Sequence, residues 1–198
     1  MTAADKSAKP AVTRWTKSTM YADMWADPDD DPRENQATVA GERDTLLDYL
    51  RRYRLTLTMK CEGLEPDQLA CRSVPPSTMS LLGIVRHMAE VERSWFRRVM
   101  AQADAPPLYW SDDVPDADWD GAVADQAIVD QAWRAWREEV AFAEQFAADR
   151  ADLTVEGMLR TGGRIPLRDV LVHMIEEYAR HCGHADLLRE RIDGRIGQ

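Results

Sequence analysis

The chain has 198 residues, of which 44% are hydrophobic, and this length suits a single domain with a sizeable core. Its formal net charge of −10 argues against nucleic acid and anionic membranes as partners, because both attract basic surfaces. No apolar run is long enough for a membrane span or a secretory signal, and three cysteines at unrelated spacings do not form a disulfide framework, so we expect a cytoplasmic protein.

Residues 1–41 differ in composition from the rest of the chain. They contain no leucine, and residues 27–34 form an acidic run bounded by prolines, which buries too little apolar surface to fold by itself. Aromatic residues such as Trp15, Tyr21 and Trp25 are nevertheless present, and such residues are sparse in disordered tails. We therefore expect a partly extended arm that packs along the domain or across a partner subunit.

A helical period begins at Gly41. Leu46, Leu50, Leu57 and other apolar residues recur at spacings of three and four, which predicts a first helix that ends near residues 63–66. A second helix follows, with Ser77 or Thr78 as its N-cap. Its apolar stripe consists of Leu81, Ile84, Met88, Val91, Trp95 and Val99.

The second half of the chain predicts two more helices. Residues 104–121 are rich in proline and aspartate and read as a long connection, and a third helix spans about 122–150. Residues 154–164 favour a short hairpin or an extended connection around their glycines, after which Pro166 opens a fourth helix that Gly194 ends. The pattern predicts an all-α four-helix bundle over residues 42–194 with a long crossover loop and a tail at 195–198.

The four histidines gather in two segments. His87 lies in the second predicted helix, and the other three lie in the last one, at positions 173, 181 and 184. At about 100° per residue, Glu177, His181 and His184 share a sector of about 60° with the apolar residues Val170 and Leu188. A carboxylate on such a core-facing stripe is costly unless it is paired or binds a cation.

These residue types favour a divalent metal site between two helices. His87 lies at the edge of an apolar stripe, and the spacing of Glu177 and His181 puts both on one helix face. One carboxylate and two imidazoles suit zinc, nickel or iron(II) and leave coordination positions open. His173 and His184 flank the pair and are candidates for partners that orient the ligands.

Other interpretations of the same residues remain open. His87 alone is more typical of a hydrogen-bonded core histidine, and Glu177 could pair with a core arginine such as Arg86 or Arg54. Two further interpretations are possible. Glu177 and His181 could form an ordinary pair on the helix surface, and His173 and His184 could form a polar rim at the mouth of the bundle. We interpret Trp95, Trp133 and Trp136 as core or interface anchors, and Cys182 as no ligand because it points about 100° away from His181.

Four segments resemble the DinB-like superfamily and, within it, the actinobacterial branch known as DUF664. They are residues 41–50, residues 63–69, the segment from His87 to Phe96, and above all the segment from His173 to Glu190. The resemblance spans about residues 42–194. It implies a four-helix bundle, commonly a homodimer, with a metal held by three side chains from two helices.

Many members of this superfamily use three histidines, whereas this chain has Glu177 where the last helix usually carries the first histidine of a His-x-x-x-His pair. The departure is similar to mycothiol-dependent maleylpyruvate isomerase, whose zinc is held by His, Glu and His. Carried over by motif, the resemblance implies His87, Glu177 and His181 as ligands, with zinc as the expected metal.

The resemblance also implies chemistry with a low-molecular-weight thiol such as mycothiol. We expect a metal-dependent transferase or isomerase that takes a thiol cosubstrate and an electrophilic substrate, with the metal stabilising the thiolate. No residue is assigned as a separate general base, and His184 is a candidate by position alone. The alternatives are a metal-dependent hydrolase and a non-enzymatic, stress-related dimeric protein that binds metal.

Overall fold

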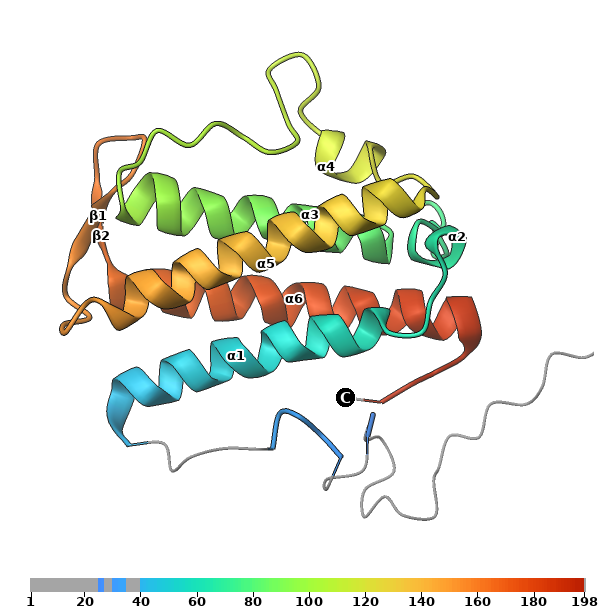
Figure 1. Ribbon diagram of the computed structural model, residues 1–198, viewed down its shortest axis with the longest axis horizontal. Coiled ribbons are helices and arrows are strands. Elements are labelled where there is room, and N and C mark those ends of the chain that lie inside the picture. The colour runs from blue at the N-terminus through green and yellow to red at the C-terminus, as the bar shows by residue number, and fades with distance from the viewer. Residues whose placement is uncertain (1–24, 27–29, 35–39, 198) are drawn as a thin grey trace, which may run out of the picture.

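Four long helical stretches run alongside one another in the computed structural model, which describes residues 25–26, 30–34 and 40–197 (Figure 1). The all-α four-helix bundle is therefore confirmed. In chain order the described elements are α1 (Gly41–Cys61), α2 (Pro66–Leu69), α3 (Leu81–Glu92), the π-helical continuation η1 (Arg93–Met100), α4 (Ala117–Asp120), α5 (Gln126–Ala148), β1 (Glu156–Met158), β2 (Arg164–Pro166) and α6 (Leu167–Asp193).

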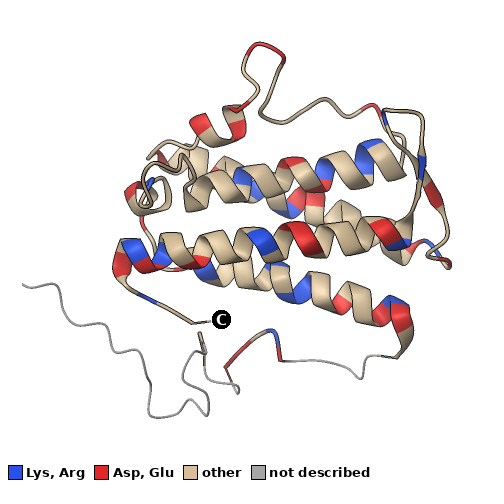
Figure 2. Ribbon diagram, turned by 180° about the vertical axis from the view of Figure 1, so that it is seen from behind, with Lys and Arg blue, Asp and Glu red and all other residues tan. Residues whose placement is uncertain are grey.

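The four long helices form a series of packed neighbours. Helix α1 packs on α6, α6 on α3, and α3 on α5. The predicted apolar stripes form the shared core, in which Leu57, Leu81, Met88 and Val170 are fully buried. Seen from behind, acidic and basic positions are interspersed along the helices (Figure 2). None of the described helices is both long and apolar enough to cross a membrane.

Helix boundaries follow local capping chemistry, with corrections to the predictions. The N-cap of α3 is Ser80, whose hydroxyl accepts a hydrogen bond from the Gly83 amide at 3.1 Å, so the expected Ser77 or Thr78 is wrong. Helix α5 starts later than expected because Asp125 caps it. Pro166 is the N-cap of α6 and not its first helical residue. Gly194 ends α6 in the left-handed conformation, at φ 81°, as predicted.

Two short elements lie between the long helices. Strands β1 and β2 pair antiparallel, which confirms the hairpin expected near residues 154–164. The predicted long connection between the second and third helices is present, and it contains the helical turn α4. Helix α3 holds this connection: buried Glu90 accepts from the Leu108 amide at 2.6 Å, and Arg86 donates to the Asp118 carbonyl at 2.8 Å.

A buried polar chain links all four long helices. Arg54 of α1 donates through Nε and Nη2 to the two carboxylate oxygens of Glu92 in α3, at 2.8 Å each. The Tyr178 hydroxyl of α6 donates to Glu92 at 2.8 Å, and the Trp136 indole of α5 donates to Tyr178 at 2.9 Å. Burial raises the pKa of Tyr178 well above its usual value, so its hydroxyl stays protonated and donates.

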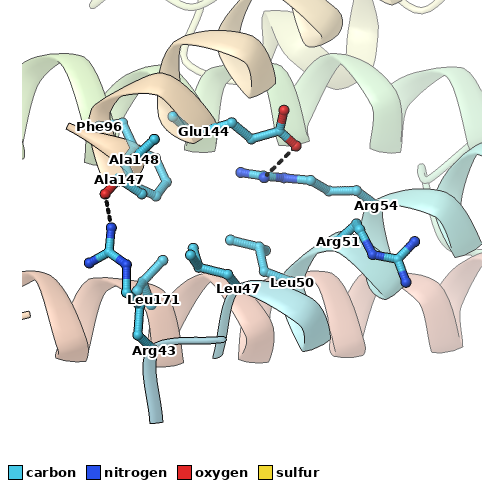
Figure 3. A pocket seen from close by; sticks show the side chains of 11 residues that line it. Arg43, Leu47, Leu50, Arg51, Arg54, Phe96, Glu144, Ala147, Ala148 and Leu171 are labelled. Atoms are coloured by element: carbon cyan, nitrogen blue, oxygen red, sulfur yellow. Dashed lines mark hydrogen bonds and ion pairs between the residues drawn. The ribbon is translucent and has the colours of Figure 1, made fainter. Parts of the chain in front are cut away.

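A hollow of about 400 Å³ opens on the α1–α5 side of the bundle (Figure 3). Its apolar walls include Leu47, Phe96 and Leu171. Arg43 crosses its edge to donate to the Ala147 carbonyl, and Arg54 faces Glu144 at 3.4 Å (Figure 3). All the histidines lie elsewhere, so this hollow is separate from the candidate metal centre.

Trp25, a described residue of the predicted N-terminal arm, packs on the bundle. Its side chain is buried, and the cationic ends of Lys60 and Arg195 each lie 3.8 Å from the centre of an indole ring. Trp15, Met20, Tyr21 and Met24 lie outside the described residues. The extent of the arm and the boundaries at residues 41 and 194 therefore stay predictions.

Candidate metal centre

Three side chains from two helices converge between α3 and α6. His87 comes from the middle of α3, and Glu177 and His181 lie one turn apart on α6. One donor atom from each of the three lies within 4.8 Å of the others. Because such donors bind zinc at about 2.0–2.2 Å, small side-chain rotations would let all three reach a single ion.

His181 is the most buried of the three, with 7% of its surface exposed. Its Nε2 lies 3.7 Å from a carboxylate oxygen of Glu177. Burial, followed by the proximity of His87 and His184, lowers the pKa of His181 to about 3. The imidazole is therefore neutral at physiological pH, and the neutral form is the one that binds a metal.

Glu177 is half-buried and faces two histidines. One oxygen lies 3.5 Å from Nε2 of His173, and the other faces His181. The alternative of a core arginine is wrong for both candidates, because Arg54 pairs with Glu92 and Arg86 donates to backbone carbonyls of α4. Within the described part of the chain, the ion-pair partners of Glu177 are these two histidines.

Each of the three side chains has an outer partner. His184 lies with its Nδ1 3.4 Å from Nδ1 of His181, and His173 contacts Glu177 as described above. These are the two histidines that the sequence placed beside the ligands. The third partner is Asp118 of α4, whose Oδ2 lies 2.8 Å from Nδ1 of His87. We did not anticipate Asp118, because nothing in the local pattern of an aspartate-rich connection distinguishes one carboxylate from the next.

Two tryptophans flank the cluster. Trp119 of α4 stacks on His87 with ring centres 4.8 Å apart, and it lies 6.0 Å from His181. Trp95 lies 4.5 Å from His173, so it borders the site. Trp136 instead belongs to the core, as expected, where it contacts Trp133 edge to face. The approach to the three donors is therefore bounded by aromatic rings.

The donor set fits a divalent cation. Two imidazoles and one carboxylate are borderline to hard ligands that zinc, nickel and iron(II) accept, and a set of three leaves room for an exogenous ligand. Neutral His181 has one unprotonated ring nitrogen that can bind an ion, and the contact between Nδ1 of His87 and Asp118 leaves Nε2 of His87 available as the second nitrogen ligand. An ordinary surface pair of Glu177 and His181 would not recruit a third donor from another helix.

The cysteines of the chain do not join the cluster. Burial raises the pKa of Cys61 and of Cys182 to about 12, and the Cys182 thiol lies 3.7 Å from the Tyr53 carbonyl. Cys71 is exposed. Cys182 is thus no candidate nucleophile, in agreement with its direction on the helix.

The difference in burial between exposed Cys71 and the two buried cysteines predicts how fast each thiol reacts. In a titration of the folded protein with a chromogenic disulfide at pH 7.5, we expect one thiol to react within minutes, because Cys71 alone is accessible. All three should react after denaturation. Cys71→Ser should abolish the fast phase, and a fast phase that survives in this variant would contradict the burial of the other two.

The four-helix bundle, the long crossover that lets α5 run in the same direction as α3 (Figure 1), and the donor set from two helices define a DinB-like helical bundle. A family model of mycothiol-S-transferases matches residues 45–194, about three quarters of the chain, and the protein belongs to that family. No curated protein matches the chain.

Proposed function

We propose that the protein is a metal-dependent S-transferase that conjugates a mycothiol-like thiol to an electrophile. The observation that carries this proposal is the convergence of His87, Glu177 and His181 from separate helices, in a chain of the mycothiol-S-transferase family. Zinc is the metal that we expect, since its preferred donors are of these types.

A bound divalent cation would stabilise the thiolate of the cosubstrate and so supply a nucleophile at neutral pH. In the transfer itself, the thiol gives up its proton, its sulfur bonds to the electrophilic carbon, and the leaving group departs with the bonding electrons. The protein has to hold the three donors in place and to limit access of water. Trp119 and Trp95, which border the cluster, serve the second purpose.

We assign no separate general base. His184 was the candidate by position, but its Nδ1 faces Nδ1 of His181, which suits an orienting role. The thiol proton would then pass to solvent at the half-exposed side of the cluster, where His87 and His173 keep part of their surface accessible.

The test is a conjugation assay with zinc-loaded protein, mycothiol and an alkyl halide electrophile, following loss of the free thiol and appearance of the thioether. We expect conjugation well above the uncatalysed rate for wild type and a loss of at least about 100-fold for His181→Ala, since its donor is removed. Zinc-loaded protein that conjugates no faster than buffer would contradict the proposal. Turnover of ester substrates by the same sample would instead favour the hydrolase.

Thiol binding offers a second readout that needs no electrophile. A thiol that binds the folded, zinc-loaded protein should raise its melting temperature, and the rise should grow with the logarithm of the thiol concentration once that concentration exceeds Kd. The S-methyl analogue of the same thiol is the matched control, because it cannot form a thiolate. Equal protection by both would argue against thiolate binding.

Three finer expectations accompany the proposal. Membership of the DUF664 branch rests on the quoted motifs, the homodimer on the family resemblance, and the cytoplasmic location on the composition. Light scattering of the purified protein checks the dimer directly.

A further inference from the structure

We propose that Asp118 is a positioning residue of the metal centre, which holds His87 in the tautomer that presents Nε2 to the ion. The inference rests on the proposed metal site. It concerns a side chain from the crossover loop, 31 residues away from His87 along the chain.

The contacts of Asp118 are those of a built-in partner. Asp118 is buried, with 7% of its surface exposed. Its Oδ2 lies 2.8 Å from Nδ1 of His87, and its Oδ1 accepts a hydrogen bond from the Trp119 amide at 3.0 Å. Both carboxylate oxygens are therefore engaged. His87 is its ion-pair partner among the described residues, so the buried carboxylate is directed at this imidazole.

Helix α4 is fixed in place by the helix that carries His87. Arg86, the neighbour of His87, donates to the carbonyls of Asp118 and Ala117 at 2.8 Å each. Trp119 lies on Gly83, where an added Cβ would come within 2.9 Å of the indole ring. The absence of a side chain at Gly83 thus lets α4 approach α3 closely enough for Asp118 to reach His87.

The contact decides which nitrogen of His87 is available. A carboxylate accepts only, so Nδ1 must carry the proton and the lone pair resides on Nε2. The same hydrogen bond makes Nε2 of the imidazole a stronger electron-pair donor to a metal. Loss of such outer partners typically weakens metal binding by about 10–100-fold. Of the three outer contacts, this one is the shortest, at 2.8 Å against 3.4 and 3.5 Å for the others.

The experiment compares zinc affinity, measured by competition with a chromophoric chelator, in wild type, Asp118→Asn and Asp118→Ala. We expect the Kd for zinc to rise about 10–100-fold in both variants. The asparagine amide can donate from its NH₂ group to Nδ1 of His87, which favours the tautomer with the proton on Nε2, the nitrogen that should bind the metal. Asp120→Asn is the matched control: it makes the same change on the same helical turn, but at an exposed carboxylate that pairs with Arg72, and its Kd should stay within about twofold.

A tautomer readout separates positioning from a merely structural role. Long-range ¹H–¹⁵N correlation spectra of the metal-free protein should show His87 with its proton on Nδ1, and the signal is assigned by its loss in His87→Gln. In Asp118→Ala we expect a shift toward the Nε2-protonated form, while circular dichroism shows unchanged helix content. An Nδ1-protonated His87 in Asp118→Ala would overturn the inference.

The outcomes also separate this inference from the proposed function. If His87→Gln and Glu177→Ala bind zinc like wild type, the metal centre itself is wrong. If those two lose zinc while both Asp118 variants keep wild-type affinity, the metal centre stands and the role of Asp118 is refuted.

Discussion

Glu177→Ala is expected to lose zinc binding while keeping its fold. Glu177 supplies the only carboxylate of the three donors, so its removal should raise the Kd by more than the roughly 10–100-fold that loss of an outer partner costs. The half-buried position faces two histidines, and the truncation leaves no uncompensated charge in the core. Metal content after dialysis and a chelator competition give the affinity, and circular dichroism gives the helix content.

Glu176→Ala is the matched control for this experiment. The neighbouring carboxylate is exposed and points about 100° around α6 from Glu177, so its removal changes the net charge equally without touching the cluster. We expect wild-type zinc affinity for this variant. Glu177→Ala protein that retains stoichiometric zinc, or that unfolds whether or not zinc is present, would show that Glu177 is a structural carboxylate and not a ligand.

The largest effect on stability is expected from Glu92→Ala. Glu92 is fully buried and compensates the guanidinium of Arg54, which is almost as deeply buried. Removing one partner of a buried ion pair strands the other charge and costs about 3–5 kcal/mol. Urea unfolding followed by circular dichroism measures the free energy of unfolding.

Two further variants make this test specific. Glu144→Ala removes a largely exposed carboxylate that lies 3.4 Å from the same guanidinium, and we expect it to cost less than about 1 kcal/mol. The double variant Arg54→Met, Glu92→Leu removes both charges and should regain much of the lost stability. A Glu92→Ala protein as stable as Glu144→Ala would contradict the assigned importance of the buried pair.

The helices were predictable because apolar spacing reports burial on one face without reference to the rest of the fold. Leu57 and Val170 are examples, and both are fully buried as their stripes required. The N-cap of α3 was missed because Ser77, Thr78 and Ser80 are chemically equivalent candidates, and the choice depends on where the chain turns after the prolines. The helical turn α4 could not be predicted because four residues are too few to show the hydrophobic spacing of a helix.

The candidate site was predictable except for the side chain that the crossover loop contributes. Glu177, His181 and His184 share a face by spacing alone, and His87 could be added because histidine is scarce in this chain. Asp118 could not be predicted, since its contact with His87 depends on how the crossover loop folds back over α3. Arg54 was correctly suspected to be a core arginine, but its partner is Glu92, and spacing within one helix does not report pairing between helices.

The buried pair of Arg54 and Glu92 also sets the axial alignment of the bundle. Sliding α3 along α6 by one turn, about 5.4 Å, would carry Glu92 away from both Arg54 and the Tyr178 hydroxyl. Tyr178 adjoins Glu177 in α6, and Glu92 lies five residues beyond His87 in α3. The position along the bundle at which the His87 imidazole faces the Glu177 carboxylate is therefore set by buried groups that are not themselves part of the candidate site.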